Sequence, residues 1–515
     1  MGFLEDRDFT DVETIPEYYK GKTLFITGGS GFMGKVLLEK LLYSCTELNR
    51  IYLLLRNKRN VNSEDRLKAI FDSHCFDRLR KERPGVFESK VFVVNGDVSE
   101  IGLGLSAEDR ALLTNQVHII FHVAASVRFD DPFAVAVNLN LRGTREVVEL
   151  AKETKLLEVL VHVSTSYSNT NRNPIKEVMY PPHADWRDTI TVSEETDEYT
   201  LSAITPKYLG DLPNTYTFTK QLAEHVVYEE KGKLPAIIIR PSIVISSHKE
   251  PLPGWLENFN GPVGLIVASG KGILRAIYSD PALVADYMPV DIAIKSFIAG
   301  AWSRGTKPLS PDDDVPVYNC CAGDLNNITI GRLLELGVKV MEEAPLGGML
   351  WRAGGAVTTS KTVYYLKVLL LHLLPALLVD IILWVIGRKP MLVKIQRRIY
   401  MANIALRYYI TQQWTFSNEN FVKLRSVIKK EDKENFFYDL ESIDQFEFFR
   451  LGCIGGKKYL LNEREEDIPK ARAHYHRMIY LDLFVKFLFF GFIIWRLLQT
   501  NFVQDILQSV YSSFF

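Results

Sequence analysis

The amino-acid sequence predicts an α/β fold with a doubly wound parallel sheet, followed by a mostly helical C-terminal domain with a hydrophobic membrane segment. Three observations predict this architecture. Residues 22–42 have the pattern of a strand, a glycine-rich turn and a helix, the first half of a βαβ unit. Short apolar runs then alternate with helix-like segments. Two long apolar stretches, 363–386 and 480–498, lie in the last third of the chain.

The glycine-rich turn contains Gly28, Gly31 and Gly34, after the apolar run 24–26 and before leucines at helical spacing. Glycines let the phosphates of a ligand approach the backbone, and the N–H groups at a helix start favour a pyrophosphate. The spacing is G-x-x-G-x-x-G rather than G-x-G-x-x-G. An ordinary strand-to-helix turn is the alternative, but the surrounding strand and helix favour nucleotide binding.

The remaining apolar runs are continuous rather than alternating, as in strands that are buried on both faces of a parallel sheet. The expected strands after the first are 51–55, 91–94, 117–123, 159–163 and 236–239. The expected helices between them are about 63–80, 106–114, 133–154 and 216–231. In such sheets ligands bind beyond the carboxyl ends of the strands, so the residues that follow each run are the candidates for chemistry.

The end of the second strand bears on the choice between NADH and NADPH. Arg56 follows this strand, Lys58 and Arg59 come next, and no acidic residue occurs before Glu64. An arginine at this point accommodates the 2′-phosphate of NADP, whereas an acid would bind the ribose of NAD. A solvated basic loop is the alternative; with the glycine turn, we expect NADPH.

Tyr216 and Lys220 form a Y-x-x-x-K pair, and positions i and i+4 lie on one face of a helix. An ammonium beside a phenol favours the phenolate, so we expect Lys220 to lower the pKa of Tyr216 and to make it a usable acid or base. Ser164, Thr165 and Ser166 follow the fifth strand and can supply a hydroxyl for the substrate oxygen.

The spacing of the pair alone is not specific. Tyr18 and Lys22 have the same spacing, but they precede the first strand and cannot belong to a helix within the βαβ array. A helix-surface tyrosine is the alternative for Tyr216. The position of Tyr216 between two core strands favours the catalytic interpretation.

Composition excludes several classes of protein. The chain has 515 residues and a net charge of -1, which does not indicate a nucleic-acid surface. Its five cysteines form no C-x-x-C pair and no metal spacing with histidine, so we expect reduced thiols and no metal site. The acidic N-terminus lacks the apolar region of a secretory signal.

The two apolar stretches differ in polar content. Residues 363–386 include Lys367, His372, Pro375 and Asp380, which would be costly in an isolated span, so a buried or interfacial helix is an equal alternative. Residues 480–498 are long enough for a span, with charges only toward the ends. A basic stretch after the first, residues 388–398, would suit anionic headgroups.

Several segments together resemble a known family. The T-G-x-x-G-x-x-G turn, the Ser-Thr after the fifth strand and the Tyr216/Lys220 pair resemble the extended branch of the short-chain dehydrogenase/reductase (SDR) superfamily, which has a Rossmann fold. The segments IPEYYKGK, VHVSTSYSN, PNTYTFTK, IIRPSIV and DYMPVD narrow the resemblance to alcohol-forming fatty acyl-CoA reductases. It covers residues 15 to about 330 well and the C-terminal part more loosely.

The resemblance implies NADPH, a long-chain acyl-CoA substrate and a primary fatty alcohol, formed by two hydride transfers through an aldehyde. The implied catalytic residues are Thr165, Tyr216 and Lys220, although Ser166 stands where the family pattern has alanine. The predicted cofactor-binding residues are Gly28, Ser30, Gly31, Phe32, Gly34, Arg56, Asp97, Val98, Ala124, Ala125, Lys220, Pro241, Ser242 and Ile243.

The predicted organisation has five parts. They are a polar lead-in (1–20), an NAD(P)-binding Rossmann reductase domain with substrate insertions (21–330), a helical C-terminal domain (331–478), a candidate transmembrane helix (479–498) and a tail (499–515). Within the second part, residues 166–215 are either a substrate lid or a decorative insertion.

We expect a membrane-anchored enzyme of wax or ether-lipid type metabolism, with its catalytic domain in the cytosol at the peroxisomal or endoplasmic reticulum membrane. The alternatives are another membrane-associated extended SDR, such as a sterol dehydrogenase, and a membrane-tethered dinucleotide-binding protein without turnover.

Overall fold

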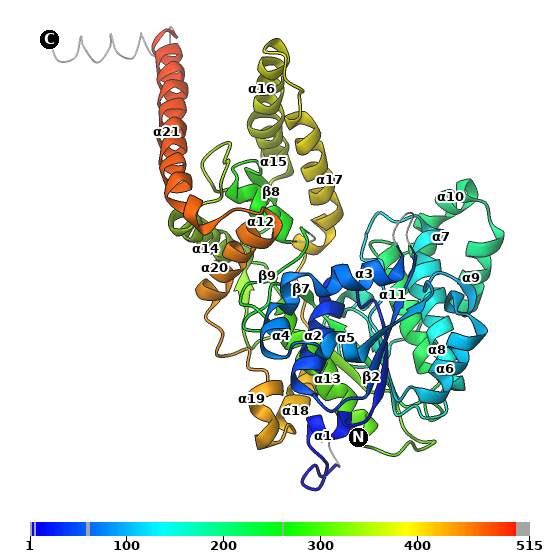
Figure 1. The fold of residues 1–515 in the computed structure, drawn as a ribbon. Coiled ribbons are helices and arrows are strands. Elements are labelled where there is room, and N and C mark those ends of the chain that lie inside the picture. Colours follow the sequence, from blue (N-terminus) through cyan, green and yellow to red (C-terminus); the bar gives the residue numbers. More distant parts are fainter. Residues whose placement is uncertain (1–2, 5–6, 58–61, 260–261, 501–515) are drawn as a thin grey trace, which may run out of the picture.

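A parallel sheet forms the centre of the computed structural model, which describes residues 3–4, 7–57, 62–259 and 262–500 (Figure 1). Its seven strands lie in the order β11-β6-β5-β4-β1-β2-β3, and every neighbouring pair is parallel. The strands are β1 (Thr23–Thr27), β2 (Arg50–Leu55), β3 (Val91–Asn95), β4 (Ile119–His122), β5 (Val159–Val163), β6 (Ala236–Pro241) and β11 (Val317–Cys320). The predicted doubly wound sheet is confirmed. Lys58, Arg59 and residues 501–515 of the predicted tail lie outside the described ranges.

Helices cover both faces of the sheet, because successive strand residues point to opposite faces. Leu24 and Ile26 pack on one side and Phe25 on the other. The first face carries α2 (Phe32–Ser44), α3 (Ser63–Phe71), α4 (Asp77–Glu82), α5 (Val86–Lys90) and α13 (Val290–Gly305). The second carries α6 (Ala107–Gln116), α7 (Phe133–Ala136), α8 (Gly143–Glu153), α9 (Trp186–Glu195), α10 (Glu198–Leu209) and α11 (Thr215–Tyr228).

The structure differs from the predicted elements where tertiary packing interrupts a local pattern. The expected helix 63–80 is broken after Phe71, because the short helix η1 (His74–Phe76) turns Cys75 and Phe76 into the core. The expected helix 133–154 contains a π-helical turn, η3 (Val137–Arg142). Three two-stranded sheets were not predicted: β7 (Ile243–Ile245) with β10 (Tyr287–Pro289), β9 (Val284–Ala285) with β12 (Ile328–Thr329), and β8 (Ala276–Tyr278) with β13 (Ala356–Thr358). The further short helices are η2 (Ile101–Gly104), η4 (Ser166–Asn169), η6 (Lys430–Asp432), η7 (Gly456–Leu460) and η8 (Glu465–Asp467).

The prediction that residues 1–20 are a polar lead-in is wrong. Thr14 and Glu17 form a capping box at the start of α1 (Ile15–Tyr19). Asp432 accepts the backbone N–H of Ile15 at 2.9 Å, and the rings of Tyr18 and Tyr19 are buried in the core. Residues 14–19 are therefore an integral part of the core around the sheet.

The chain after residue 330 returns to the sheet instead of forming a separate body. It comprises α14 (Ile330–Glu343), α18 (Glu419–Ser426), α19 (Lys433–Phe436) and α20 (Gln445–Gly455), besides the apolar helices. Helix α18 packs against β11 and α13, and its side chains Phe421 and Leu424 are buried in the main core. The predicted domain boundaries stay a prediction, but this C-terminal segment shares the core of the Rossmann part.

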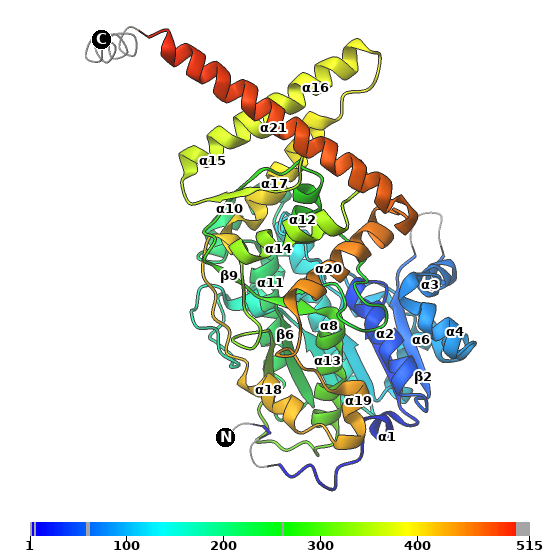
Figure 2. The same ribbon diagram turned by 90° about the vertical axis from the view of Figure 1, so that its left-hand side faces the viewer.

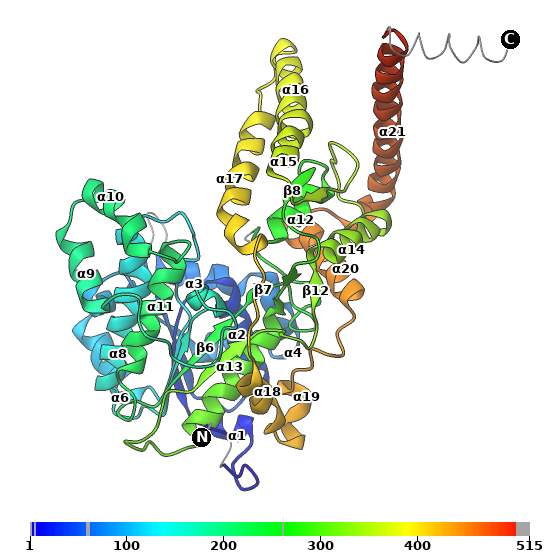
Figure 3. The ribbon, with the colours of Figure 1, turned by 180° about the vertical axis from the view of Figure 1, so that it is seen from behind.

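The apolar stretches form helices that project from the molecule on the same side (Figures 1, 2 and 3). The first is built from α15 (Lys361–Val368), the π-helical η5 (Leu369–Leu373) and α16 (Leu374–Val385), and it returns as α17 (Leu392–Ile410). The second is the outer part of α21 (Ile468–Leu498). By length and composition, 361–385 and 468–498 could each cross a membrane. The alternative that 363–386 is a buried helix is wrong, because its apolar side chains are mostly exposed.

Gly34 tests how tightly the glycine turn is packed. A Cβ atom at Gly34 would lie 2.2 Å from the carbonyl oxygen of Gly28, and neither backbone segment can move without disturbing β1 or α2. We expect Gly34→Ala to lower the free energy of unfolding by about 2 kcal/mol or more, measured by chemical denaturation.

The matched control is Gly337 in α14, where a Cβ atom would meet nothing within 4 Å. Gly337→Ala should raise the stability by up to about 1 kcal/mol, because alanine is the better helix former. Equal effects of the two variants would contradict the role assigned to the turn.

Candidate active site

A cavity of about 630 Å³ lies at the carboxyl ends of β1, β4, β5 and β6. The sheet order reverses between β1 and β4, and such a switch point is where open α/β sheets bind ligands. One part of the cavity is lined by the glycine turn, Thr165 and Tyr216. The rest is mainly apolar, with walls from α12 (Pro262–Gly270), β8, α14 and the end of α17. The cavity can therefore hold a nucleotide cofactor and an apolar substrate side by side.

The glycine turn brings backbone close to the cavity. Gly28 has a φ of 78°, and a Cβ atom there would lie 2.6 Å from the backbone nitrogen of Ala124, so β1 and the end of β4 nearly touch. Gly31 is the N-cap of α2 and provides no side-chain cap. The first N–H groups of α2 are therefore not covered by a capping side chain, as dinucleotide phosphates require. These residues fit an NAD(P) cofactor.

The structure brings most of the predicted cofactor residues to this cavity. Its lining includes Gly28, Ser30, Gly31, Phe32, Gly34, Ala125, Pro241, Ser242 and Ile243. Ala124 lies behind the lining, where its N–H donates to Thr27 Oγ1 at 3.3 Å, and Val98 is buried beside Gly143. Their roles as cofactor ligands stay predictions.

Arg56 lies at the carboxyl end of β2, beside Asp97 at the end of β3. Its guanidinium is 3.3 Å from the Asp97 carboxylate, and a hydrogen bond from Ser99 helps to lower the pKa of Asp97. Arg66 from α3 donates to the backbone carbonyl of Arg56, which brings a second guanidinium to this edge. Sequence reasoning missed Arg66, because it lies ten residues after Arg56 in a helix that folds back over the strand.

Tyr216 lies in the first turn of α11, where the side chain of Asn214 caps the helix through the N–H of Thr217 at 3.0 Å. The centre of the Phe129 ring lies 5.8 Å from that of Tyr216 and 5.0 Å from that of Tyr409. Burial raises the pKa of Tyr216 to about 12, although a hydrogen bond with Thr165 opposes the shift. The predicted lowering of this pKa by Lys220 is wrong, because loss of water around the phenolate dominates.

Lys220 is buried behind Tyr216 and contacts the end of β5. Its ammonium donates to the carbonyl oxygen of Val163 at 2.6 Å. Burial lowers the pKa of Lys220 to about 8, and the carboxylate of Glu224 partly opposes this shift. The pair predicted from the sequence therefore exists on one helix face, but Lys220 stabilises the backbone under Thr165 rather than the phenolate.

The structure distinguishes the three hydroxyls after β5. Ser166 donates to the carbonyl oxygen of Arg240 at 2.6 Å, and Ser164 donates to Glu224 at 2.5 Å. Only Thr165 combines a position in the cavity wall with a hydrogen bond to Tyr216. The Ser166 hydroxyl is therefore used in a hydrogen bond to the backbone, and the role expected for Thr165 is unaffected.

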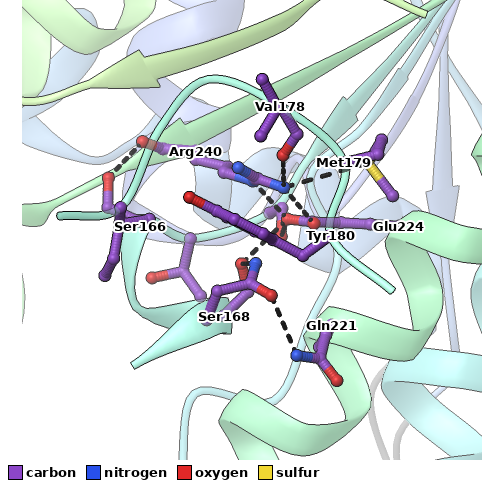
Figure 4. Close-up of polar contacts among 12 residues, drawn as sticks. Ser166, Ser168, Val178, Met179, Tyr180, Gln221, Glu224 and Arg240 are labelled. Carbon is purple, nitrogen blue, oxygen red and sulfur yellow. Dashed lines mark hydrogen bonds and ion pairs between the residues drawn. The ribbon is translucent and has the colours of Figure 1, made fainter. Parts of the chain in front are cut away.

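A buried polar network lies directly beneath these residues (Figure 4). Arg240 of β6 makes a bidentate ion pair with Glu224 of α11, at 2.8 and 2.7 Å, and both side chains are about fully buried. Arg240 also donates to the carbonyl oxygens of Lys176 and Val178 at 3.2 and 3.1 Å. Glu224 accepts from Ser164 and from Ser168 (3.0 Å). The network joins the helix of Tyr216 to the segment of Thr165, and sequence reasoning missed it, although Glu224 is four residues after Lys220.

The C-terminal third supplies much of the cavity wall. Leu406, Tyr409, Ile410 and Trp414, from the end of α17 and just beyond, all line it. Asn214, the N-cap of α11, donates to the Tyr409 hydroxyl at 2.7 Å. Sequence reasoning missed these residues, because nearly two hundred residues separate them from Tyr216.

Two other interpretations of the sequence are decided by the contacts. Helices α9 and α10, within residues 166–215, pack against η3, α7 and α11, and none of their described residues lines the cavity, which favours the decorative insertion over the lid. The segment SGKGILR offers Lys271 and Arg275 as cations for the phosphates of an acyl-CoA. Lys271 instead pairs with Glu463 at 3.2 Å, and Arg275 with Asp482 at 3.5 Å.

Across the described ranges, no group of three histidine, cysteine or acidic residues could hold a metal ion.

The parallel sheet, the glycine turn and the cavity at the switch point are those of a dinucleotide-binding α/β protein. A NAD-binding family model described as "Male sterility protein" matches residues 26–297, and a second model of that description matches residues 371–463. The chain is 40% identical to human "Fatty acyl-CoA reductase 1" over 90% of both chains, and 34% identical to Drosophila melanogaster "Fatty acyl-CoA reductase wat" over 96% of both. The chain belongs to the fatty acyl-CoA reductase family.

A solved structure supports the fold independently. The reductase domain of a non-ribosomal peptide synthetase from Mycobacterium tuberculosis matches with a TM-score of 0.58 at 20% identity, covering 88% of this chain and 97% of that one. The predicted resemblance and the predicted Rossmann fold are confirmed.

The buried ion pair gives a stability prediction. Glu224→Gln leaves the Arg240 guanidinium buried without a counter-charge, so we expect the free energy of unfolding to fall by about 3–5 kcal/mol in chemical denaturation. Glu229→Gln is the control, because Glu229, the C-cap of α11, also pairs with an arginine, Arg187 at 2.6 Å, but at the surface. Its loss should be about 1 kcal/mol or less. A similar loss for both variants would contradict the importance of burial.

Proposed function

We propose that this protein reduces a long-chain fatty acyl-CoA to a primary fatty alcohol with NADPH, by two hydride transfers through an aldehyde. The alcohol would enter lipid biosynthesis of the wax or ether-lipid type. The names of the relatives support the acyl-CoA substrate class. The observation that carries the proposal is that one continuous cavity is lined by the glycine turn, by the Tyr216–Thr165 pair and by a long apolar wall.

The apolar wall suits a fatty acyl chain better than a polar substrate. Leu265, Ile266, Leu334, Leu406 and Ile410 contribute to it, from three helices that are distant in the chain. Burying methylene groups against such side chains is favourable by about 0.8 kcal/mol each. The thioester carbonyl would then lie at the other end, beside Tyr216 and Thr165.

Tyr216 and Thr165 would hold the carbonyl oxygen while negative charge develops on it. When bound, NADPH supplies the hydride for each reduction. Because the pKa of Tyr216 is about 12, its phenol stays protonated at neutral pH and can donate a proton to the alkoxide in the aldehyde step. Lys220 would hold the ribose of the cofactor with the N–H groups that Val163 does not use.

We further propose that α21 anchors the protein in the peroxisomal or endoplasmic reticulum membrane, with the catalytic domain in the cytosol. The support is the exposed apolar surface of α21 from Tyr480 to Leu498. Such a run is long enough to span the hydrocarbon core.

The direct test is incubation of the purified protein with acyl-CoAs of several chain lengths and either NADPH or NADH. Products are identified by mass spectrometry. A primary alcohol formed only from long-chain acyl-CoA would support the proposal. Absence of alcohol and aldehyde with every acyl-CoA would refute it.

Arg56 tests the cofactor preference. We expect Arg56→Ala to raise the KM for NADPH by about tenfold or more, because a charge-assisted hydrogen bond to the 2′-phosphate is lost, and to leave the KM for NADH nearly unchanged. Arg50→Ala, at the amino end of the same strand, is the control and should change neither value. Equal use of both cofactors by the parent enzyme would overturn the assignment.

Tyr216 tests the chemical step. Tyr216→Phe should lower kcat by about 10²–10³ or more while NADPH binding, followed by fluorescence, stays nearly intact. Tyr18→Phe is the matched control, since Tyr18 has the same spacing to a lysine but is buried in α1 before β1. An undiminished rate for Tyr216→Phe, or an equal loss for Tyr18→Phe in a folded protein, would falsify the assigned site.

A further inference from the structure

The helical hairpin of residues 361–410, formed by α15, η5, α16 and α17, has two buried polar side chains, His372 and Asp380. His372 accepts the backbone N–H of Arg275 at 2.8 Å. Asp380 accepts the N–H groups of Met391, Leu392 and Val393, each at 2.9 Å, and so caps the start of α17. Two of the three ionisable groups that counted against membrane contact are thus satisfied within the protein, and so are the first N–H groups of α17.

The outer surface of the hairpin is apolar. Leu366, Leu370, Leu374, Leu378, Ile382 and Trp384 are all exposed, at positions along the whole length of α15 to α16. Pro375 lies just after the π-helical turn η5, which interrupts the regular hydrogen-bond pattern of the continuous helix 361–385 beside the residue that lacks an N–H. An exposed apolar surface of this extent is characteristic of a membrane or partner contact.

Cationic residues gather at the tip of the hairpin. Arg388 and Lys389 lie in the loop after α16, and Lys394, Arg397 and Arg398 lie in the first turns of α17, all exposed. Long cationic side chains reach the phosphate groups of lipids while their stems stay in apolar surroundings. Farther along α17 the exposed side chains are apolar again, including Met401 and Ile404. This distribution fits a lipid bilayer better than a protein partner.

The base of the hairpin is tied to α21 and to the cavity. Arg275 donates its backbone N–H to His372 of the hairpin, and its guanidinium pairs with Asp482 of α21 at 3.5 Å. Asp482 also accepts from Trp351 at 2.6 Å. Arg275 therefore contacts both apolar elements, whose helices cross in the view of Figure 2. Ile277 of β8 and Leu406 of α17, at this base, line the apolar part of the cavity.

We propose that the hairpin is a second membrane-embedded element, which lies in the hydrocarbon core of the same bilayer as α21. The hairpin thereby places the apolar end of the cavity at the membrane. This goes beyond the proposed function, in which α21 alone anchors the chain. Lipid acyl chains cover the apolar surface of the hairpin, and the cationic side chains at its tip contact lipid phosphates.

Depth-dependent quenching tests the proposal on the full-length chain. Leu370→Cys and Leu378→Cys carry an environment-sensitive fluorophore, and the parent chain gives the labelling background, since four of its five cysteines are buried. The vesicles contain phosphatidylcholine and phosphatidylserine at about four to one. Matched vesicles have bromine on the phosphatidylcholine acyl chains. Enzyme activity, or cofactor binding, verifies the fold of each variant.

Two leucines serve as controls. Leu156, 46% exposed against 53% for Leu378, precedes β5 at the opposite end of the sheet. Leu488, in the apolar part of α21, is also 53% exposed. We expect brominated lipid to quench the probes at 370, 378 and 488 at least about threefold more than the probe at 156, as positions within the hydrocarbon core require.

Quenching at 488 without quenching at 370 and 378 would overturn the proposal and leave the α21 anchor intact. A blue-shifted but unquenched probe at 378 would overturn it too, because a second copy of the chain would then cover the hairpin. A second measurement needs no variant: lipids with a photoreactive group in the acyl chain should modify peptides from 363–386 of the parent chain. Modification confined to α21 would again overturn the proposal.

Discussion

The buried ion pair between Glu224 and Arg240 is the contact on which the geometry of the site depends. Two charges in the protein interior are tolerated only when their remaining hydrogen-bonding capacity is used. Ser164, Ser168 and the carbonyl groups of Lys176 and Val178 meet this requirement. The ion pair therefore holds α11, β6 and the segment after β5 in one arrangement. Tyr216 lies on the first of these and Thr165 on the last, so their hydrogen bond depends on the network beneath them.

A second constraint comes from the way the chain leaves the reductase core and returns to it. The hairpin of residues 361–410 begins beside β8, extends outward and ends with Tyr409 and Ile410 in the cavity wall. One continuous segment thus forms both an apolar outer surface and part of the inner wall. The second family match, over residues 371–463, covers most of this segment. The C-terminal third is consequently part of the site, and not only an anchor.

The environment of Tyr216 illustrates how tertiary packing can reverse a local expectation. Four residues on a helix bring Lys220 to the same face, and a nearby ammonium alone would lower the phenol pKa. The aromatic rings of Phe129 and Tyr409 exclude water from the phenol, and the Lys220 ammonium is engaged by the Val163 carbonyl. Burial then outweighs attraction, so the pKa of Tyr216 rises to about 12 and its phenol stays protonated at neutral pH.

The sequence by itself determined the parallel sheet, the glycine turn and the helix with Tyr216 and Lys220, because each is a local pattern. Six of the seven strands of the sheet coincide with mainly apolar runs in the sequence, and β5 begins and ends as predicted. Only the tertiary structure decided the place of β11, the buried tyrosines of α1, the aromatic wall and the inward-facing Asp380 and His372. Each of these depends on contacts with elements that fold back from elsewhere in the chain. A local pattern of residue types does not specify such long-range contacts.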